Sequence, residues 1–199
     1  LQGNSNMFAN MASQSVEVIE GEQPIQILAY ELIQDRAGAG KFRGGAPYRR
    51  DYRFLEREAI LQVRSDRHDI RPYGLYGGKP GQPSCNYINP GDNPEPTTSK
   101  LTMMIEHGDV FRHELAGGGG WGDPLERDPE HVLMDVRNEY VSAAAAREQY
   151  GVAVDTGSWT MDAAKTETLR AEMRAARGST PPPKIAWTDA PDGGRAGHE

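Results

Sequence analysis

"LAGGGGWGDPLERDPE", residues 115–130, holds four consecutive glycines at 117–120 and a further glycine at Gly122. The spacing Gly-x-Gly-x-x-Gly fits the dinucleotide-binding fingerprint, in which a helix starts at the last glycine and directs its N-terminus at the pyrophosphate. Here the helical pattern starts only near Pro129, and the carboxylate of Asp123 would repel a phosphate. We therefore interpret this stretch as a structural feature and not as a nucleotide site.

Glycine allows the backbone to adopt positive φ angles or to press against another backbone. We expect a glycine hinge that leads from the last strand into a capped helix. A second reading, which the sequence leaves open, is close approach of this backbone to a ligand or a partner subunit. The hinge residues are Gly117, Gly118, Gly119, Gly120 and Gly122.

Beyond the glycines the apolar residues follow a period of 3.6, which predicts helices over 129–140, 142–150 and 161–177. Polar cap residues precede the first two helices, and glycines follow the last two. The residues that set these boundaries are Asp128, Ser142, Gly151 and Gly178.

Upstream of the glycines the pattern is that of strands. Residues 24–33 are apolar at nearly every position, which predicts a strand buried on both faces. Residues 48–55 alternate with period 2, and a hairpin with 59–65 is expected. Residues 101–115 predict a second hairpin around a turn at 107–108.

Strands first and helices last indicate an α+β fold. We expect a β-rich region over 1–115, with antiparallel hairpins and long Gly/Pro loops. The glycine hinge and three short helices occupy 116–177, and a Pro/Gly-rich tail, 178–199, is expected to be disordered.

Composition excludes several classes of protein. The net charge is −7, which argues against a nucleic-acid-binding domain, and no apolar stretch is long enough for a membrane span. A single cysteine, Cys85, excludes an internal disulfide, and the expected location is the cytoplasm. Residues 41–79 carry ten Lys/Arg against five Asp/Glu, a local charge of +5. That zone suits an anionic ligand or an acidic partner, or else it is a solvated strand face with mixed charges.

The Gly/Pro-rich loop at 65–83 is the best candidate for a binding site. Its charged side chains surround Tyr73 and Tyr76, which suits an anionic or amide-bearing ligand or a protein interface equally. The acidic neighbours of its histidine do not define a metal site, so no metal is expected. The candidate residues are Asp66, Arg67, His68, Arg71, Gly77, Gly78 and Lys79.

Three stretches, in order, resemble the C-terminal part of the hydantoinase B / 5-oxoprolinase family. They are "AYELIQDRAGAGKFRGGAPYRRDYRFLE" (29–56), "SDRHDIRPYGLYGGKPGQPSCNYINPG" (65–91) and "GDVFRHELAGGGGWGDPLERDPEHVLMDVRNEYVSAAAAREQYGV" (108–152). The similarity runs from about 13 to 177, and the tail lies outside it.

The resemblance implies an ATP-dependent hydrolase of cyclic amides such as 5-oxoproline or N-methylhydantoin. Its partner would be a hydantoinase A-type ATPase that holds ATP and Mg, within a hetero-oligomer. A divalent metal, where the family has one, would lie elsewhere in the parent chain, and no cofactor is expected in this chain. The resemblance places no catalytic residue here, so this chain alone is expected to be inactive.

The first residue is Leu1, and family chains are much longer, so we expect a piece of a longer polypeptide or a processed chain. Two alternatives to the hydrolase remain open. The chain could belong to an ATP-dependent ketone carboxylase, or it could be a scaffold or assembly subunit without activity of its own.

Overall fold

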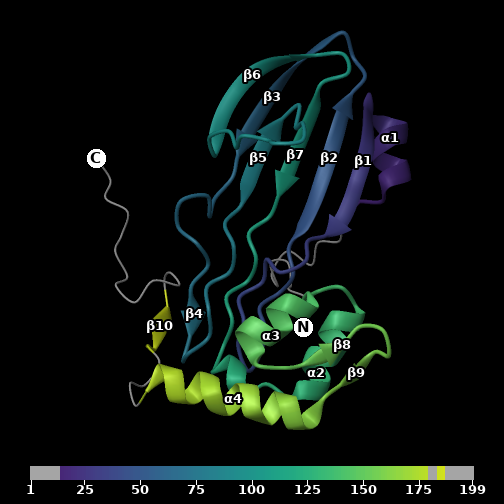
Figure 1. Cartoon of the computed structure of the whole chain (residues 1–199). Helices are drawn as coiled ribbons and strands as arrows, with labels where there is room; N and C mark the ends of the chain where they lie inside the picture. Colours follow the sequence, from purple (N-terminus) through teal and green to yellow (C-terminus); the bar gives the residue numbers. More distant parts are fainter. Residues whose placement is uncertain (1–13, 179–182, 187–199) are drawn as a thin grey trace.

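The computed structural model describes residues 14–178 and 183–186. The longer strands and the first helix lie at one end of the molecule, the other helices and the two-residue strands lie at the other end, and extended segments run between them (Figure 1). The α+β fold with antiparallel sheets is confirmed. In chain order the elements are α1 (Val16–Glu22), β1 (Ile25–Leu32), β2 (Tyr48–Phe54), β3 (Glu58–Arg64), β4 (Gly74–Leu75), β5 (Cys85–Ile88), β6 (Lys100–Glu106), β7 (Val110–Glu114), the 3-10 helix η1 (Pro124–Glu126), α2 (Pro129–Arg137), α3 (Ala143–Tyr150), β8 (Val154–Asp155), β9 (Thr160–Met161), α4 (Ala163–Arg177) and β10 (Ile185–Ala186).

The main sheet has four antiparallel strands in the order β1-β2-β7-β5. β1 forms one edge of this sheet, and its outward side chains Leu28, Tyr30 and Leu32 are exposed. The prediction of a strand buried on both faces is therefore wrong for 24–33. An unbroken apolar run does not show whether a strand is central or at an edge.

The two predicted hairpins are also wrong in their pairing. β2 pairs with β7, and β3 pairs with β6. The segment 48–64, which holds β2 and β3, therefore runs antiparallel to the segment 100–114, which holds β6 and β7. The chain bends at 55–57 and 107–109, where the His107 N–H donates to the Arg57 carbonyl. Both sites that the sequence indicates as hairpin turns are corners of one continuous ribbon.

The three predicted helices are confirmed as α2, α3 and α4. The Asp128 side chain accepts from the Glu130 N–H, and the Ser142 side chain accepts from the Ala145 N–H. Gly151 ends α3 with φ of 62°. Apolar residues of α2 and α3, together with Ala39, Val141 and Val152 outside the helices, form the core cluster. Its members from α2 and α3 are Val132, Val136, Ala145, Ala146 and Tyr150.

Two short elements lie outside the expected pattern. The sequence shows no clear periodicity over 1–23, yet Val16–Glu22 forms a helix beside β1. β10 pairs with β4, with Ile185 opposite Leu75 and Ala186 opposite Gly74. The prediction of a disordered tail is therefore wrong for Ile185 and Ala186. The remainder of that prediction, on 179–182 and 187–199, lies outside the described residues. The division of the chain into regions 1–115, 116–177 and 178–199 stays a prediction.

Candidate functional site

The predicted glycine hinge is one of three extended segments that pack together, at 36–45, 72–82 and 115–122. We call this arrangement the glycine bundle. The Gly38 N–H donates to the Gly118 carbonyl at 2.8 Å, and the Gly120 N–H donates to the Lys79 carbonyl at 2.9 Å. The Lys79 N–H in turn donates to the Ala39 carbonyl at 2.7 Å. Each segment therefore bonds to the other two through the main chain.

Glycine is required in the bundle because backbone atoms of neighbouring segments occupy the space of a side chain. A Cβ atom on Gly119 would lie 1.8 Å from the Tyr73 carbonyl oxygen, and one on Gly120 would lie 2.0 Å from the Ala39 carbonyl oxygen. Cβ atoms on Gly117, Gly118 and Gly78 would likewise meet backbone atoms within 2.7 Å. Gly122 has φ of 74°, in the left-handed region that favours glycine.

These glycines do not fit a nucleotide phosphate. Their open sides are filled by the protein's own backbone. The next α-helix starts only at Pro129, and the Asp123 carboxylate accepts from the Leu125 N–H and binds Arg177 at 2.6 Å. A phosphate placed at the last glycine would face this carboxylate.

At the start of the predicted binding loop, main-chain carbonyl groups accept hydrogen bonds from Ser84. Ser84 donates from its hydroxyl to the Asp66 carbonyl and from its N–H to the Arg67 carbonyl. The Asp66 and Arg67 side chains are exposed. His68 contacts Asp69 with 3.0 Å between Nδ1 and Oδ1.

The rest of that loop runs into the glycine bundle. Arg71 donates from Nε to the Gly81 carbonyl at 2.8 Å. Gly77 has φ of 97°, and its N–H donates to the Pro183 carbonyl. Gly78 and the main chain of Lys79 belong to the bundle, whereas the Lys79 side chain is exposed.

Within the described part of the chain, no hydrogen bond or ion pair joins the side chains of Asp66, Arg67 and Lys79. The role of these candidate residues in binding stays a prediction.

The sequence did not indicate a buried ion cluster on the main sheet. Arg49 and Arg112 both bind the Asp51 carboxylate, with shortest distances of 2.7 and 2.8 Å, and the Asp51 side chain is 5% exposed. Burial by itself raises the pKa of the Asp51 carboxyl, but hydrogen bonds from the two arginines outweigh burial and lower it. The alternation at 48–55 predicts that Arg49 and Asp51 share a face of the strand. It does not predict that β7 is the neighbouring strand, and β7 supplies Arg112.

Beside this cluster, Arg36 connects the glycine bundle to the sheet. It pairs with Glu114 at 3.3 Å and donates to the Pro83 carbonyl at 2.9 Å. Burial, together with a hydrogen bond to Cys85, raises the pKa of the Tyr87 hydroxyl to about 12. The Tyr87 hydroxyl therefore stays protonated at neutral pH.

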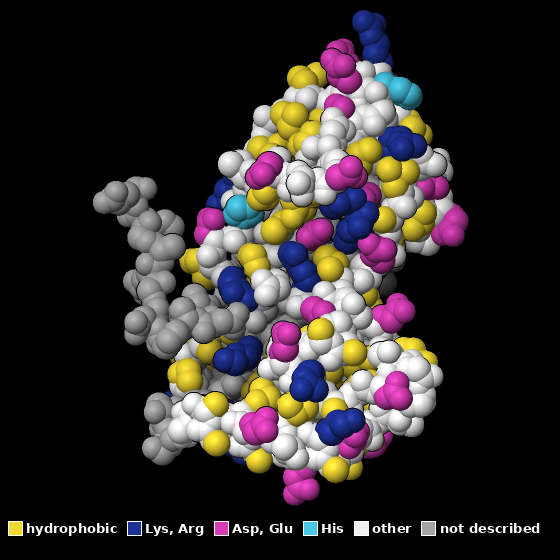
Figure 2. Space-filling model, viewed as in Figure 1, with side chains coloured by type: hydrophobic (Ala, Val, Ile, Leu, Met, Phe, Trp, Pro, Cys, Tyr) yellow, Lys and Arg dark blue, Asp and Glu magenta, His cyan; other side chains and the backbone are white. Residues whose placement is uncertain are grey.

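A second buried cluster joins the glycine bundle to α2. Arg43 and Arg127 bind the Asp135 carboxylate at 3.1 and 2.8 Å, and the Arg43 side chain is 4% exposed. With the Lys41–Glu126 pair at 3.2 Å, acidic residues distant in the chain thus compensate two charges of the basic zone, those of Lys41 and Arg43. Figure 2 likewise shows basic and acidic side chains interspersed over one face.

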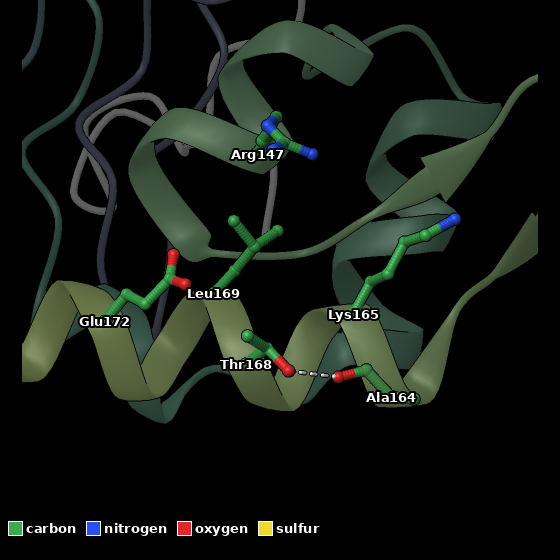
Figure 3. Close-up of a pocket in the computed structure, with 6 residues that line it drawn as sticks. All are labelled: Arg147, Ala164, Lys165, Thr168, Leu169 and Glu172. Atoms are coloured by element: carbon green, nitrogen blue, oxygen red, sulfur yellow. Dashed lines mark hydrogen bonds between the residues drawn. The ribbon is translucent and has the colours of Figure 1, made fainter.

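A groove of about 330 Å³ lies between α3 and α4. Figure 3 shows Arg147 reaching toward it from α3, while the other lining residues belong to α4. Lys165 is 73% exposed and pairs with Asp162, and Thr168 donates to the Ala164 carbonyl. With Arg147, Lys165 and Glu172 as its charged side chains, the groove has one carboxylate and no histidine among its lining residues.

No group of three or more His, Cys, Asp or Glu residues that could hold a metal ion occurs within 14–178 and 183–186. His113 is instead hydrogen-bonded to Asn86 at 2.7 Å between Nδ1 and Oδ1, and burial lowers its pKa. None of the described helices is long and apolar enough to cross a membrane.

Comparison with known proteins identifies the family. The Hydantoinase B/oxoprolinase family model matches residues 2–124. A putative D-/L-hydantoinase subunit of the B type, from a Pseudomonas species, is 32% identical over 82% of this chain and 28% of its own length. This chain therefore spans only about 28% of that relative.

Two solved structures share the fold. The ATP-dependent caprolactamase from Pseudomonas jessenii superposes with a TM-score of 0.68 and 32% identity, covering 80% of this chain and 28% of its own. Nucleotide-free acetone carboxylase has a TM-score of 0.65 at 22% identity, over 84% of this chain and 27% of its own, and shows the fold alone. Together with the family match, these similarities show that the chain belongs to the hydantoinase B/oxoprolinase family.

Proposed function

We propose that this chain is the C-terminal part of a hydantoinase B-type subunit in an ATP-dependent enzyme that opens cyclic amides, of the 5-oxoprolinase or N-methylhydantoinase type. The observation that carries this proposal is the similarity to the ATP-dependent caprolactamase, at 32% identity over 80% of the chain. A lactam, a hydantoin and 5-oxoproline share the cyclic amide bond that such an enzyme breaks.

ATP and Mg would be held by a partner of the hydantoinase A type. The packing of the glycine bundle supports this assignment, because the glycines that resemble a fingerprint leave no room for a phosphate. Any divalent metal of the complex would lie in the remainder of the parent chain, and this chain alone would be inactive. The buried carboxylates Asp51 and Asp135 support that view, since arginines occupy both of them.

Within the complex this chain would supply structure and, through the 65–83 loop, contacts to substrate or partner. The exposed side chains of Asp66, Arg67 and Lys79 are accessible for such contacts. Replacing Arg67 and Lys79 by alanine should impair turnover or assembly. If both variants leave turnover and assembly intact, the loop has no such role.

Co-purification tests the proposal. The full chain should co-purify with an ATPase subunit, and ATP hydrolysis by the complex should rise with 5-oxoproline, a hydantoin or caprolactam. A rise only with a ketone plus bicarbonate would instead select an ATP-dependent ketone carboxylase, the alternative that the family resemblance leaves open. Association without any substrate-dependent turnover would indicate a scaffold or assembly subunit.

A further inference from the structure

Three aromatic side chains stand together on the surface of the glycine bundle. Phe42, Tyr76 and Trp121 each come from a different segment of the bundle, and they are 61%, 56% and 45% exposed. The Trp121 ring lies 5.6 Å from the Phe42 ring and 5.7 Å from the Tyr76 ring, measured between centroids. We call these three residues the aromatic platform.

Main-chain contacts hold the backbone that carries the platform. Phe42 and Trp121 exchange two main-chain hydrogen bonds of 2.9 Å each. Tyr76 has φ of 52°, a left-handed conformation that a bulky residue keeps only where its surroundings impose it. Its N–H donates to the Lys184 carbonyl at 2.8 Å, which ties it to the C-terminal strand.

Rigid, exposed aromatic side chains are typical of the centre of a protein interface. They bury a large area on binding while losing little conformational freedom. Three such rings, each about half exposed, offer an apolar area on the order of 300 Å², as large as the patches that commonly have a function. Lys41, which precedes Phe42 in the chain, pairs with Glu126 and gives the platform a polar rim.

We propose that the aromatic platform is the surface on which the remaining part of the hydantoinase B-type subunit docks. This inference rests on the proposed function, because it takes the chain to be one portion of such a subunit. In the caprolactamase the same fold occupies 28% of the chain, which leaves 72% (100% minus 28%) to pack around it. All three platform residues lie within the part matched by the family model, 2–124.

Two other exposed apolar sites lie outside the bundle. Ile60 and Met104 face each other on the β3–β6 ribbon, outside the bundle. Trp159 lies in the β8–β9 turn, is 42% exposed and has φ of 55°. Because it resembles Trp121 in exposure and Tyr76 in backbone conformation, Trp159 is a matched control.

The test is a binding titration with purified proteins. The probe is the Pseudomonas jessenii caprolactamase beta chain from which the segment matching this chain has been removed. The full wild-type chain should form a 1:1 complex with it, detected by size-exclusion chromatography and calorimetry. Trp121→Ser and Tyr76→Asn should each weaken binding at least tenfold, and Trp159→Ser should change it less than twofold. Asparagine tolerates the left-handed conformation at position 76, and circular dichroism verifies that each variant is folded.

Equal weakening by Trp159→Ser, or unchanged binding by folded Trp121→Ser and Tyr76→Asn, would overturn the proposal. So would the absence of a complex between the folded wild-type chain and a probe whose fold circular dichroism has verified. If a variant does not fold, a fluorescence measurement takes the place of its binding titration. Trp159→Phe and Trp187→Phe are introduced together, so that Trp121 is the remaining tryptophan of the chain and its emission is recorded. Emission that shifts to the blue on binding supports docking at the platform, and an unshifted spectrum contradicts it. Neither readout uses ATP, so failure of docking is distinguished from failure of the proposed activity.

Discussion

In the glycine bundle, main-chain N–H and C=O groups make the contacts between segments, whereas side chains make them in the layer of α2, α3 and α4. Gly119 and Gly120 lie so close to neighbouring carbonyls that no side chain fits. In the helical layer, Val132 and Tyr150 are buried and Arg170 donates to the Tyr150 carbonyl. The same fold thus combines glycines that leave no room for a side chain with a helical layer in which side chains of similar volume can repack.

The largest effect is expected from Gly120→Val. The added Cβ would lie 2.0 Å from the Ala39 carbonyl oxygen, so the segments must separate and their hydrogen bonds break. We expect a loss of more than about 5 kcal/mol in the free energy of unfolding, and hence little soluble protein. Gly91→Val is the control, since nothing lies within 4 Å of a Cβ there. Soluble, fully stable Gly120→Val protein would show that the bundle does not pack as described.

A smaller effect is expected from Asp135→Ala, at the junction between the bundle and the helices. Loss of this carboxylate leaves Arg43 and Arg127 buried without their shared acidic partner. The free energy of unfolding should fall by about 3–5 kcal/mol, measured by urea denaturation. Lys41→Ala removes an exposed ion pair and should cost about 0–1 kcal/mol. Equal costs for the two variants would contradict the importance of the buried junction.

Ser142→Ala tests the helical layer alone. The Ser142 side chain caps α3 by accepting from the Ala145 N–H at 3.0 Å. Its loss should cost about 1 kcal/mol in urea denaturation, and Ser142→Asp should restore most of it because aspartate also caps. If Ser142→Asp is no better than alanine, the cap is not what positions this helix.

Acid should produce the smallest effect, through the helical layer. Burial raises the pKa of Asp123, but the hydrogen bond from Arg177 and that from the Leu125 N–H outweigh it and lower the pKa. Because the folded pKa lies below the unfolded value of about 3.9, this contribution is complete above that pH and is lost as pH falls through the folded pKa.

Between pH 6 and pH 3, the wild type should therefore lose roughly 0.5–1 kcal/mol more than Asp123→Asn does, after allowance for solvent screening. Urea denaturation at the two pH values measures the difference. Identical pH dependence in both proteins would show that the Arg177–Asp123 ion pair does not stabilise the end of α4.

The same contrast explains what the sequence could predict. Helix boundaries depend on local signals, so Asp128, Ser142 and Gly151 located α2 and α3 correctly. Strand pairing depends on residues far apart, so alternation at 48–55 identified β2 but not its partner β7. The three-segment bundle was beyond prediction for the same reason. Its contacts are backbone to backbone and leave no side-chain pattern except glycine itself.

The candidate site followed the same division. The 65–83 loop was found by composition, but composition could not show that, in the described structure, no hydrogen bond or ion pair joins the side chains of Asp66 and Lys79. The buried clusters around Asp51 and Asp135 were missed because each depends on an arginine far away in the chain. Arg112 is 61 residues from Asp51, and Arg43 is 92 residues from Asp135.

The most direct test of the central claim is an equilibrium titration of MgATP into the folded full-length chain. If the glycines of 117–122 serve only to pack backbone against backbone, no saturable binding should appear at millimolar concentration, and ATP should bind only when the partner ATPase is present. Saturable binding to this chain alone, weakened by a Gly120 variant that remains folded, would contradict the account.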